Sequence, residues 1–495
     1  MSNQLVVLAI SRALQMIIGV VSLNQLARLL GPAELGRFGV LNSSALLYIG
    51  ILIAPVGNYL NRMLWEWRGS GSLRRAMAHF IGYWFLVAAG VALATLAVAR
   101  YTSVYRGYDA VHLSMLLAAF VLVNTISGAV PAAMNILGQY VAYAVLIVAT
   151  QAGCLVASVA LALVYHRSAE IWLLGQVGGS LVVGAVALTV FWKDAPGGHR
   201  TEAPLPRLSL AREAWSSVRY SYPLLISVVA GWVHFQAYRF YWTRTLTELG
   251  VFIAGYALGG LIITSIEAIL LQTFQPRLYA VVDRLKIQQR ADVLGIYISV
   301  LLSVYTLVIA GAVAIQPYLA RYVLGRDYPD VATLFVGGLV VESMRTTCSA
   351  LGLGAQFQKE TKVLVLPSVG GAVVSAALGW AGIKFLGTLG LLAAIGLATF
   401  GMLLATLLGV RAVLPGLSIA SSPILFAAVL SVPLVFMATV SGPEDSLAKA
   451  AVVAMCGAIY GSVALGIHER RFKLWSYLRR VPTHHQEAVV LGQVH

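Results

Sequence analysis

Apolar residues along this chain gather in runs of about 20, and short connectors rich in arginine, glycine or proline separate the runs. An α-helix rises about 1.5 Å per residue, so a run of roughly 20 residues crosses the hydrocarbon core of a bilayer, which is about 30 Å thick. The first run, which carries many polar groups, and the pair around 363–410 are the weakest, so 12 segments is the alternative to 14. The 14 predicted segments lie at about residues 5–27, 36–60, 79–99, 113–137, 141–165, 170–192, 221–243, 251–275, 293–316, 331–356, 363–384, 388–410, 420–440 and 447–467.

The composition agrees with a membrane protein. Of the 495 residues, 59% are hydrophobic and only 11% are charged, whereas soluble proteins average about 25% charged residues. The same values exclude a disordered chain, because apolar residues are abundant and charge is scarce. The sequence therefore predicts an all-α polytopic membrane protein.

The positive charges are distributed unevenly over the connectors. If the N-terminus is cytoplasmic, the inner connectors and the tail carry about twice as many lysine and arginine residues as the outer connectors. Cytoplasmic loops are enriched in these residues, so we expect both termini inside and an even number of spans. The net charge of +15 follows this membrane topology, and no nucleic-acid partner is expected.

The chain shows signs of two related halves. A polar stretch rich in proline and glycine at 193–219 falls near the middle of the predicted segments, and Glu34–Phe38 after the first segment is echoed by Glu248–Phe252 after the seventh. Six segments separate the copies, so both copies have the same orientation, as in transporters built from parallel repeats. We predict two pseudo-symmetric six-helix lobes plus a C-terminal helix pair. The predicted boundaries are 1–192 for the first lobe, 193–219 for a cytoplasmic linker, 220–412 for the second lobe, 413–468 for the appended pair and 469–495 for a basic cytoplasmic tail.

Motifs for catalysis are missing. The chain has no phosphate-binding GxxxxGK[ST], no HExxH, no GxSxG and no GxGxxG. Ser446-Leu447-Ala448-Lys449 matches SxxK without the companion motifs, and His484-His485 has no third ligand nearby. Cys154, Cys348 and Cys456 each stand alone in apolar stretches, which is typical of small core residues. We expect no enzyme activity, no cofactor and no metal site.

Three small-residue motifs favour close packing of helices. Gly175–Gly179, Gly255–Gly259 and Gly457–Gly461 have the GxxxG spacing that lets membrane helices approach one another. We expect these contacts within the chain.

Polar residues form stripes within several segments. Each ionisable group in a membrane helix costs about 2.5–3.5 kcal/mol on insertion scales, so such groups face a partner or a polar space. The stripes are Arg12, Gln15, Gly19 and Ser22, extended by Asn24 and Gln25, in the first segment; Asn58, Asn61 and Arg62 in the second; Trp232, Gln236, Arg239 and Thr243 in the seventh; Thr264, Glu267 and Gln275 in the eighth; and Glu342, Arg345 and Ser349 in the tenth.

Each stripe has a structural alternative. Arg62 and Arg239 lie near helix ends and can snorkel to the interface. Glu342 and Arg345 can pair with one another at the i,i+3 spacing. Arg12 and Glu267 have no oppositely charged neighbour on their own helix, and they are the stronger functional candidates.

Together the stripes predict a polar, net positive cavity between the lobes. Guanidinium groups bind phosphate oxygens in bidentate fashion and stay charged at low dielectric. We therefore expect an anionic solute, such as a phosphate-bearing headgroup.

Three stretches resemble a known family. Leu26–Phe38 is similar to the "aRlLGpeeyG.f" stretch after the first helix of polysaccharide-transporter (Wzx-type) flippases, which belong to the multidrug/oligosaccharidyl-lipid/polysaccharide (MOP) exporter superfamily. Tyr322–Ala332 resembles the outer connector "llfG..Y..a", and Tyr222–Phe240 resembles "fPlll…qaDrf". Tyr238 replaces the acidic residue common in the last motif, whereas Arg239 is retained.

The resemblance implies a flippase that moves undecaprenyl-diphosphate-linked oligosaccharide across the bacterial inner membrane for exopolysaccharide, capsule or O-antigen assembly. Alternating access of the lobes, contact with membrane lipids, and polymerase and chain-length components as pathway partners are implied as well. The implied roles are a cationic contact with the diphosphate for Arg12, Arg239 and Arg345; substrate binding for Arg62; contact with sugar hydroxyls for Gln15, Asn24, Asn61, Gln236 and Gln272; and stacking on sugar, or anchoring at the interface, for Trp232 and Tyr238. The driving force is either ion coupling through Glu267 or Glu342 or the membrane potential.

Other functions remain open at this stage. A lipid II flippase or a cation-coupled multidrug exporter would have the same fold, although drug efflux favours acidic groups and this chain has more intramembrane arginine. A membrane glycan polymerase or ligase is expected to carry a large outer loop, and the outer connectors here are short. A structural scaffold is the last alternative.

Overall fold

The protein is described by a computed structural model. The backbone description covers residues 2–102, 104–105, 107–194, 225–242, 245–282, 285–325, 328, 331–358, 360–440, 460–461, 463–468 and 470–471. Within these ranges every regular element is a helix, which confirms the predicted all-α class.

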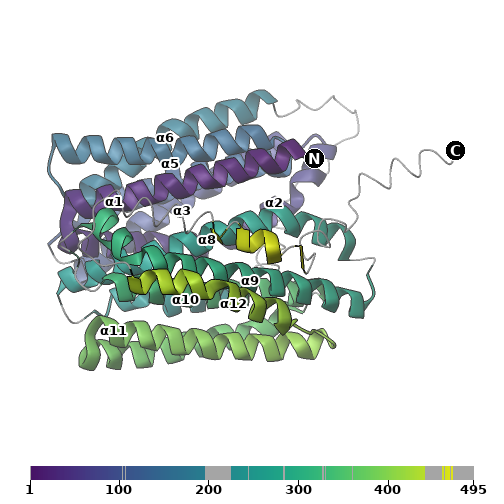
Figure 1. Ribbon diagram of the computed structural model, residues 1–495. Helices are drawn as coiled ribbons and strands as arrows, with labels where there is room; N and C mark the ends of the chain where they lie inside the picture. The colour runs from purple at the N-terminus through teal and green to yellow at the C-terminus, as the bar shows by residue number, and fades with distance from the viewer. Residues whose placement is uncertain are drawn as a thin grey trace. The chain divides into compact units, whose positions relative to one another are not determined.

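The chain divides into two compact units, Met1–Gly250 and Val251–His495. Figure 1 shows the helices of each unit. The first unit contains α1 (Ser2–Tyr48), the π-helix η1 (Ile49–Ile53), α2 (Ala54–Gly69), α3 (Leu73–Tyr101), α4 (Ala110–Ile136), α5 (Tyr140–Val164), α6 (Ala169–Asp194), the short helix Leu225–Phe235 and the 3-10 turn η2 (Ala237–Arg239).

The second unit begins within α8, whose first residues, Leu246 to Gly250, belong to the first unit. In this unit α12 (Ser421–Val440), which corresponds to the thirteenth membrane segment predicted from the sequence, packs along α9 (Ile287–Leu319). The elements are α8 (Leu246–Val282), α9 (Ile287–Leu319), the π-helix η3 (Ala320–Leu324), α10 (Val331–Phe357), the 3-10 helix η4 (Thr361–Leu364), α11 (Val365–Val413) and α12 (Ser421–Val440).

Two long helices continue through a glycine turn from one predicted membrane segment into the next; α11 contains nearly all of both its segments, whereas the second segment of α1 extends through η1 into α2. α1 turns at Gly31 (φ 77°, ψ 172°) and α11 turns at Gly387 (φ 67°, ψ −137°). Positive φ is readily adopted by glycine because it has no Cβ, so the chain turns at one residue while the flanking residues stay helical. The connectors expected around these glycines are therefore shortened to a single non-helical position.

The described helices can be compared with the membrane segments predicted from the sequence. Nine described helices are long and apolar enough to cross a membrane, and two of them, Val6–Asn61 and Thr361–Val413, contain the glycine turns. Two shorter apolar helices, Leu225–Phe235 and Ser421–Phe436, match the seventh and thirteenth predicted segments. The polytopic membrane class is confirmed. The fourteenth segment, at 447–467, lies mostly outside the described residues.

Helices suit this chain because a bilayer offers no water to unpaired backbone groups, and a helix satisfies them internally. Serine and threonine within the helices bond back to carbonyl groups of the preceding turn, as Thr125 does to Val121 at 2.6 Å. At a loop boundary, the Asp109 carboxylate accepts the His112 N–H at 2.7 Å and so caps the start of α4.

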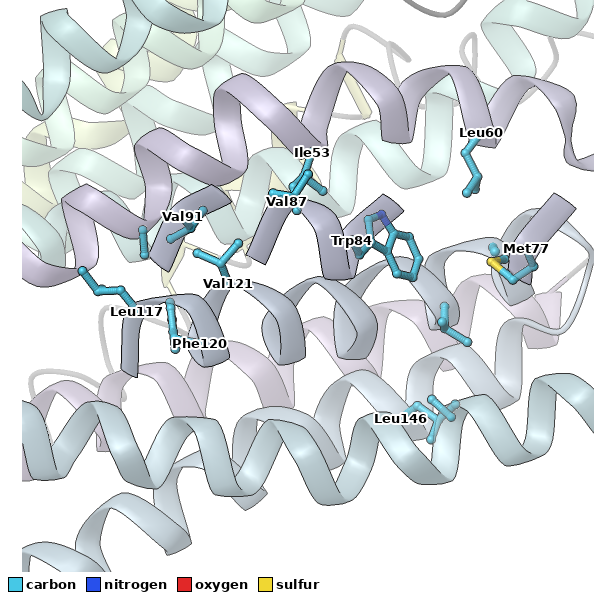
Figure 2. Close-up of a cluster of buried hydrophobic side chains, with 14 of the residues drawn as sticks. Ile53, Leu60, Met77, Trp84, Val87, Val91, Leu117, Phe120, Val121 and Leu146 are labelled. Atoms are coloured by element: carbon cyan, nitrogen blue, oxygen red, sulfur yellow. The ribbon is translucent and has the colours of Figure 1, made fainter. Parts of the chain in front are cut away.

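The core of the first unit lies between α3 and α4, with α1 and α2 beside them. Figure 2 shows Trp84, Val87 and Val91 of α3, spaced along one helix face, close to side chains of α4. Leu117 and Val121 of α4 are fully buried in this cluster. The outward faces of the helices carry exposed leucine, valine and phenylalanine, which suits lipid contact.

The GxxxG motifs pack within the chain, as expected. Gly175 and Gly179 of α6 lie directly against the backbone of α5, and Gly255 and Gly259 of α8 lie against α10. A side chain at any of these positions would overlap the neighbouring helix, which explains the small residues. Gly457 of the third motif lies outside the described residues.

The predicted linker lies almost entirely outside the described residues, since 195–224 are not described. The division between the two units falls at Gly250, after the seventh segment. The boundaries predicted for the lobes, the appended pair and the tail stay predictions.

Candidate functional site

Arg12 of α1 donates hydrogen bonds to Gln15 and Tyr143. Its Nη1 donates to Gln15 Oε1 at 2.8 Å, and its Nη2 donates to the Tyr143 hydroxyl of α5 at 3.0 Å. Gln15 is only 6% exposed, and its Nε2 has no hydrogen-bond partner among the described residues. A fixed guanidinium beside a buried amide donor is chemistry suited to an anion with several oxygen atoms.

The other polar residues of the first two segments are more dispersed. Gln25 Nε2 donates to Asn24 Oδ1 at 3.2 Å, so these two amides form their own pair. Asn61 is half-buried on α2. The side chains of Arg62 and Gln272 lie outside the described residues.

The polar residues of the seventh segment meet α1 at Ser43. The Trp232 indole N–H donates to the Ser43 carbonyl at 2.9 Å, and the Gln236 Oε1 lies 3.1 Å from the Ser43 hydroxyl. Arg239 Nη1 donates to the same hydroxyl at 2.6 Å and to the Gly39 carbonyl at 3.1 Å. Three predicted site residues are thus brought together by a serine that was not predicted.

Arg239 also contacts its neighbour. Its Nε donates to the Tyr238 hydroxyl at 3.2 Å, and its guanidinium lies 5.5 Å from the centre of the Tyr238 ring. Tyr238 is only 1% exposed, so its ring is inside the protein rather than at a membrane interface. Within the described part of the chain, the acceptors bonded to Arg239 are all neutral groups.

Ser44, next to Ser43, joins α1 to the connector between α3 and α4. The Tyr105 hydroxyl donates to Ser44 Oγ at 2.6 Å, and Tyr105 is 5% exposed. Burial raises the pKa of Tyr105 to about 12, against a smaller lowering effect of the bond to Ser44. The run Asn42-Ser43-Ser44 inside an apolar segment is the signal that could have identified this site from the sequence.

In the second unit, Arg345 of α10 lies between two carboxylates. Its Nε is 2.6 Å from Glu342 Oε2, and its Nη2 is 3.6 Å from Glu267 Oε2 of α8. The Tyr256 hydroxyl donates to the other oxygen of Glu342 at 2.9 Å. With both carboxylates ionised, Arg345, Glu342 and Glu267 together carry one net negative charge. The sequence predicted a net positive cavity, so the sign of the charge in this cluster is the opposite of the predicted one.

Two tyrosines of α9 complete this cluster. Tyr297 and Tyr305 are 1% and 2% exposed, and both lie near enough to Glu267 to interact with it electrostatically. Glu267 therefore has partners on two other helices, although it has none on its own. These tyrosines were missed because only the packing of α9 against its neighbours reveals them.

The fold of this chain is similar to that of several solved membrane transporters. A lipid II flippase, MurJ, in an inward closed conformation aligns with a TM-score of 0.63 and 12% identity, over 94% of this chain and 99% of that chain. An inward-facing multidrug resistance MATE family transporter of the MOP superfamily gives 0.55 and 13%, over 86% and 95%. A point mutant of the Vibrio cholerae MATE transporter VcmN gives 0.55 and 14%, over 83% and 98%.

No family model and no curated protein matches the sequence. At identities of 12 to 14% the likeness establishes a shared fold. The chain therefore has the MOP-type fold that its sequence motifs suggested.

Proposed function

We propose that this protein is a flippase that moves undecaprenyl-diphosphate-linked oligosaccharide from the cytoplasmic to the outer leaflet of a bacterial inner membrane, with both of its own termini in the cytoplasm. The cargo would feed exopolysaccharide, capsule or O-antigen assembly. The fold shared with a lipid II flippase over 94% of the chain supports a lipid-linked cargo. The three motif stretches support the polysaccharide branch of this fold.

The observation that carries the proposal is the Arg12 site. A charged guanidinium within a membrane-spanning helix is costly, and here Gln15 and Tyr143 fix its direction. Guanidinium groups bind phosphate oxygens in bidentate geometry, so Arg12 is the proposed contact for the diphosphate. The Nε2 of Gln15, which has no hydrogen-bond partner among the described residues, is proposed as a second donor for an oxygen of the headgroup.

Four further predicted residues are assigned by the same chemistry. We propose Asn24, Asn61 and Gln272 as contacts for sugar hydroxyls and Arg62 as a further cation for the headgroup. The hydrocarbon tail would stay in the lipid, against the exposed apolar faces of the helices. Polymerase and chain-length components are the proposed partners that receive the cargo.

The charged cluster of the second unit supports ion coupling as the driving force. Because two carboxylates share Arg345, one can take up a proton or a cation while the other still pairs with the arginine. Glu267 is the proposed ion-binding group, since its contact with Arg345 is the longer one, and Glu342 holds the arginine in place. We expect Glu267→Gln to remove the dependence of transport on an imposed pH or sodium gradient.

A lipid II flippase is the second candidate, and the MurJ likeness is the observation that favours it. The two cargoes share the lipid diphosphate and differ in the sugar. Complementation separates them, because a lipid II flippase restores growth of cells depleted of their own, whereas a polysaccharide flippase restores only polymer.

The test of the proposed function is made in cells deleted for the protein. The cells are complemented with wild type, with Arg12→Ala, or with the matched control Arg100→Ala at an exposed helix end. We expect fully assembled lipid-linked oligosaccharide to accumulate only in the deletion strain and in the Arg12→Ala strain. In both strains the accumulated oligosaccharide should be inaccessible to a glycosidase added outside the cells. An intermediate that stays accessible from outside while polymer is lost would instead indicate a polymerase.

A further inference from the structure

The two copies of the sequence echo contact one another. A methyl group added at Gly36 would overlap the Leu246 carbonyl and lie 3.3 Å from the Gly250 nitrogen. One added at Gly250 would overlap the Pro32 carbonyl and lie 3.0 Å from the Gly36 nitrogen. Each glycine thus lies against the carbonyl four residues before its counterpart, which is the reciprocal contact of a two-fold pseudo-symmetric pair.

This glycine crossing lies entirely in the first unit, at the end of the helices that the charge distribution predicts to face outward. At both glycines, the atoms nearest to an added methyl group are backbone atoms of the other copy. Small residues allow the two helix ends to approach this closely.

A second contact joins the same parts of the chain about two helical turns deeper. Ser43 is fully buried, and its hydroxyl accepts a hydrogen bond from Arg239 at 2.6 Å. Arg239 also donates to the Gly39 carbonyl, so it bonds to α1 through two neutral acceptors. Hydrogen bonds from a charged donor are stronger than neutral ones, but neutral acceptors hold an arginine less tightly than a paired carboxylate does.

We infer that Gly36, Gly250, Ser43 and Arg239 form an outer clasp, which is closed in this structure and must open when cargo leaves toward the outer leaflet. In this role Arg239 is a positioning residue that closes the clasp and is not a cargo contact. The inference rests on the proposed function for the direction of cargo movement, but the contacts themselves do not depend on the identity of the cargo.

The clasp is tested by thiol labelling of intact cells with a membrane-impermeant maleimide. The native cysteines are replaced by alanine, and Ser44→Cys serves as the reporter, because Ser44 adjoins the clasp and is 3% exposed. Gly36→Ala, Gly250→Ala and Arg239→Gln each shift the clasp toward its open form. Losing one hydrogen bond from a charged donor corresponds to roughly a tenfold increase in labelling rate.

Gly231→Ala is the matched control. Gly231 lies in the short helix that leads to Arg239, and a methyl group there meets no atom within 4 Å. Labelling in Gly36→Ala, Gly250→Ala and Arg239→Gln at the rate of Gly231→Ala would overturn the inference. Faster labelling in all three, with Gly231→Ala unchanged, is the expected result.

A second reporter separates opening from misfolding. Tyr101→Cys, at the last residue of α3 and 87% exposed, reports correct insertion, because its labelling should be equal in every variant. If a glycine variant fails this control, Arg239→Lys decides, since it keeps the charge and loses the fork of donors: faster labelling supports the clasp, and a wild-type rate overturns it.

The labelling result and the proposed function fail separately. If labelling increases as expected but deletion of the protein leaves lipid-linked intermediates unchanged, only the flippase function is contradicted. Unchanged labelling in a protein that does flip its cargo contradicts the clasp alone.

Discussion

Arg12 of α1 donates a 3.0 Å hydrogen bond to the Tyr143 hydroxyl of α5, a residue 131 positions away. This contact fixes the direction of a charge that would be costly in a bare membrane helix. We therefore expect Tyr143→Phe to reduce transport by a few-fold, whereas Arg12→Ala, which removes the charge, reduces it by roughly 10- to 100-fold. Tyr140→Phe, at the start of the same helix, is the control with expected wild-type transport. Initial rates of cargo externalisation measure all three, and equal rates in Tyr143→Phe and wild type would contradict the orienting role.

The cluster around Arg345 predicts unequal effects of its two carboxylates on stability. Glu342 lies 2.6 Å from the arginine and also accepts from Tyr256, whereas Glu267 lies 3.6 Å away. We expect Glu342→Gln to lower the free energy of unfolding by about 1–3 kcal/mol and Glu267→Gln to lower it less. Thermal unfolding of the purified protein in detergent checks the order. A larger loss in Glu267→Gln would contradict this geometry.

The contact between α5 and α6 predicts the effect of two neighbouring glycines. A methyl group at Gly179 would overlap the backbone at Cys154, whereas one at Gly178 meets no atom within 4 Å. Gly179→Ala should therefore lower the unfolding temperature, and Gly178→Ala should leave it unchanged or raise it, because alanine favours a helix over glycine by about 1 kcal/mol. Equal unfolding temperatures of the two variants would contradict the packing of these helices.

Tyr105 predicts a loss of stability at high pH. Burial raises the pKa of Tyr105 to about 12 in the folded protein, above the ordinary value of 10.0. The unfolded chain therefore gives up its phenolic proton first, and the free energy of unfolding falls as the pH rises from 10 toward 12, by at most about 1.4 kcal/mol per pH unit for this group. Tyr105→Phe should show a shallower decline over this interval in urea unfolding at several pH values. The same slope in both proteins would contradict the burial of this hydroxyl.

Much of the fold could be predicted because the apolar runs have the length of membrane-spanning helices. The hydrophobic pattern could not show the length or the backbone conformation of the connectors between the helices. Gly31 and Gly387 each turn the chain at one residue, so two connectors expected from the sequence became kinks inside longer helices. A positive φ at glycine depends on the packing of the flanking helices, which the sequence does not display.

The candidate sites could be predicted where both partners lie on one helix. Arg12 with Gln15, and Glu342 with Arg345, have the i,i+3 spacing and do form contacts. Ser43, the centre of the contacts of the seventh segment, was missed because serine is common in membrane helices and its role arises from residues about 190 positions away. Such partners across the fold require the tertiary structure.

The central claim is that the protein moves a lipid diphosphate oligosaccharide across a bilayer through a site built on Arg12. The most direct test uses purified protein in liposomes that contain undecaprenyl-diphosphate-linked oligosaccharide, with a glycosidase added outside. We predict that wild type exposes to the enzyme the lipid that protein-free liposomes keep protected, and that Arg12→Ala does not. The claim is contradicted if wild type exposes no more lipid than protein-free liposomes, or if Arg12→Ala exposes it as fast as wild type.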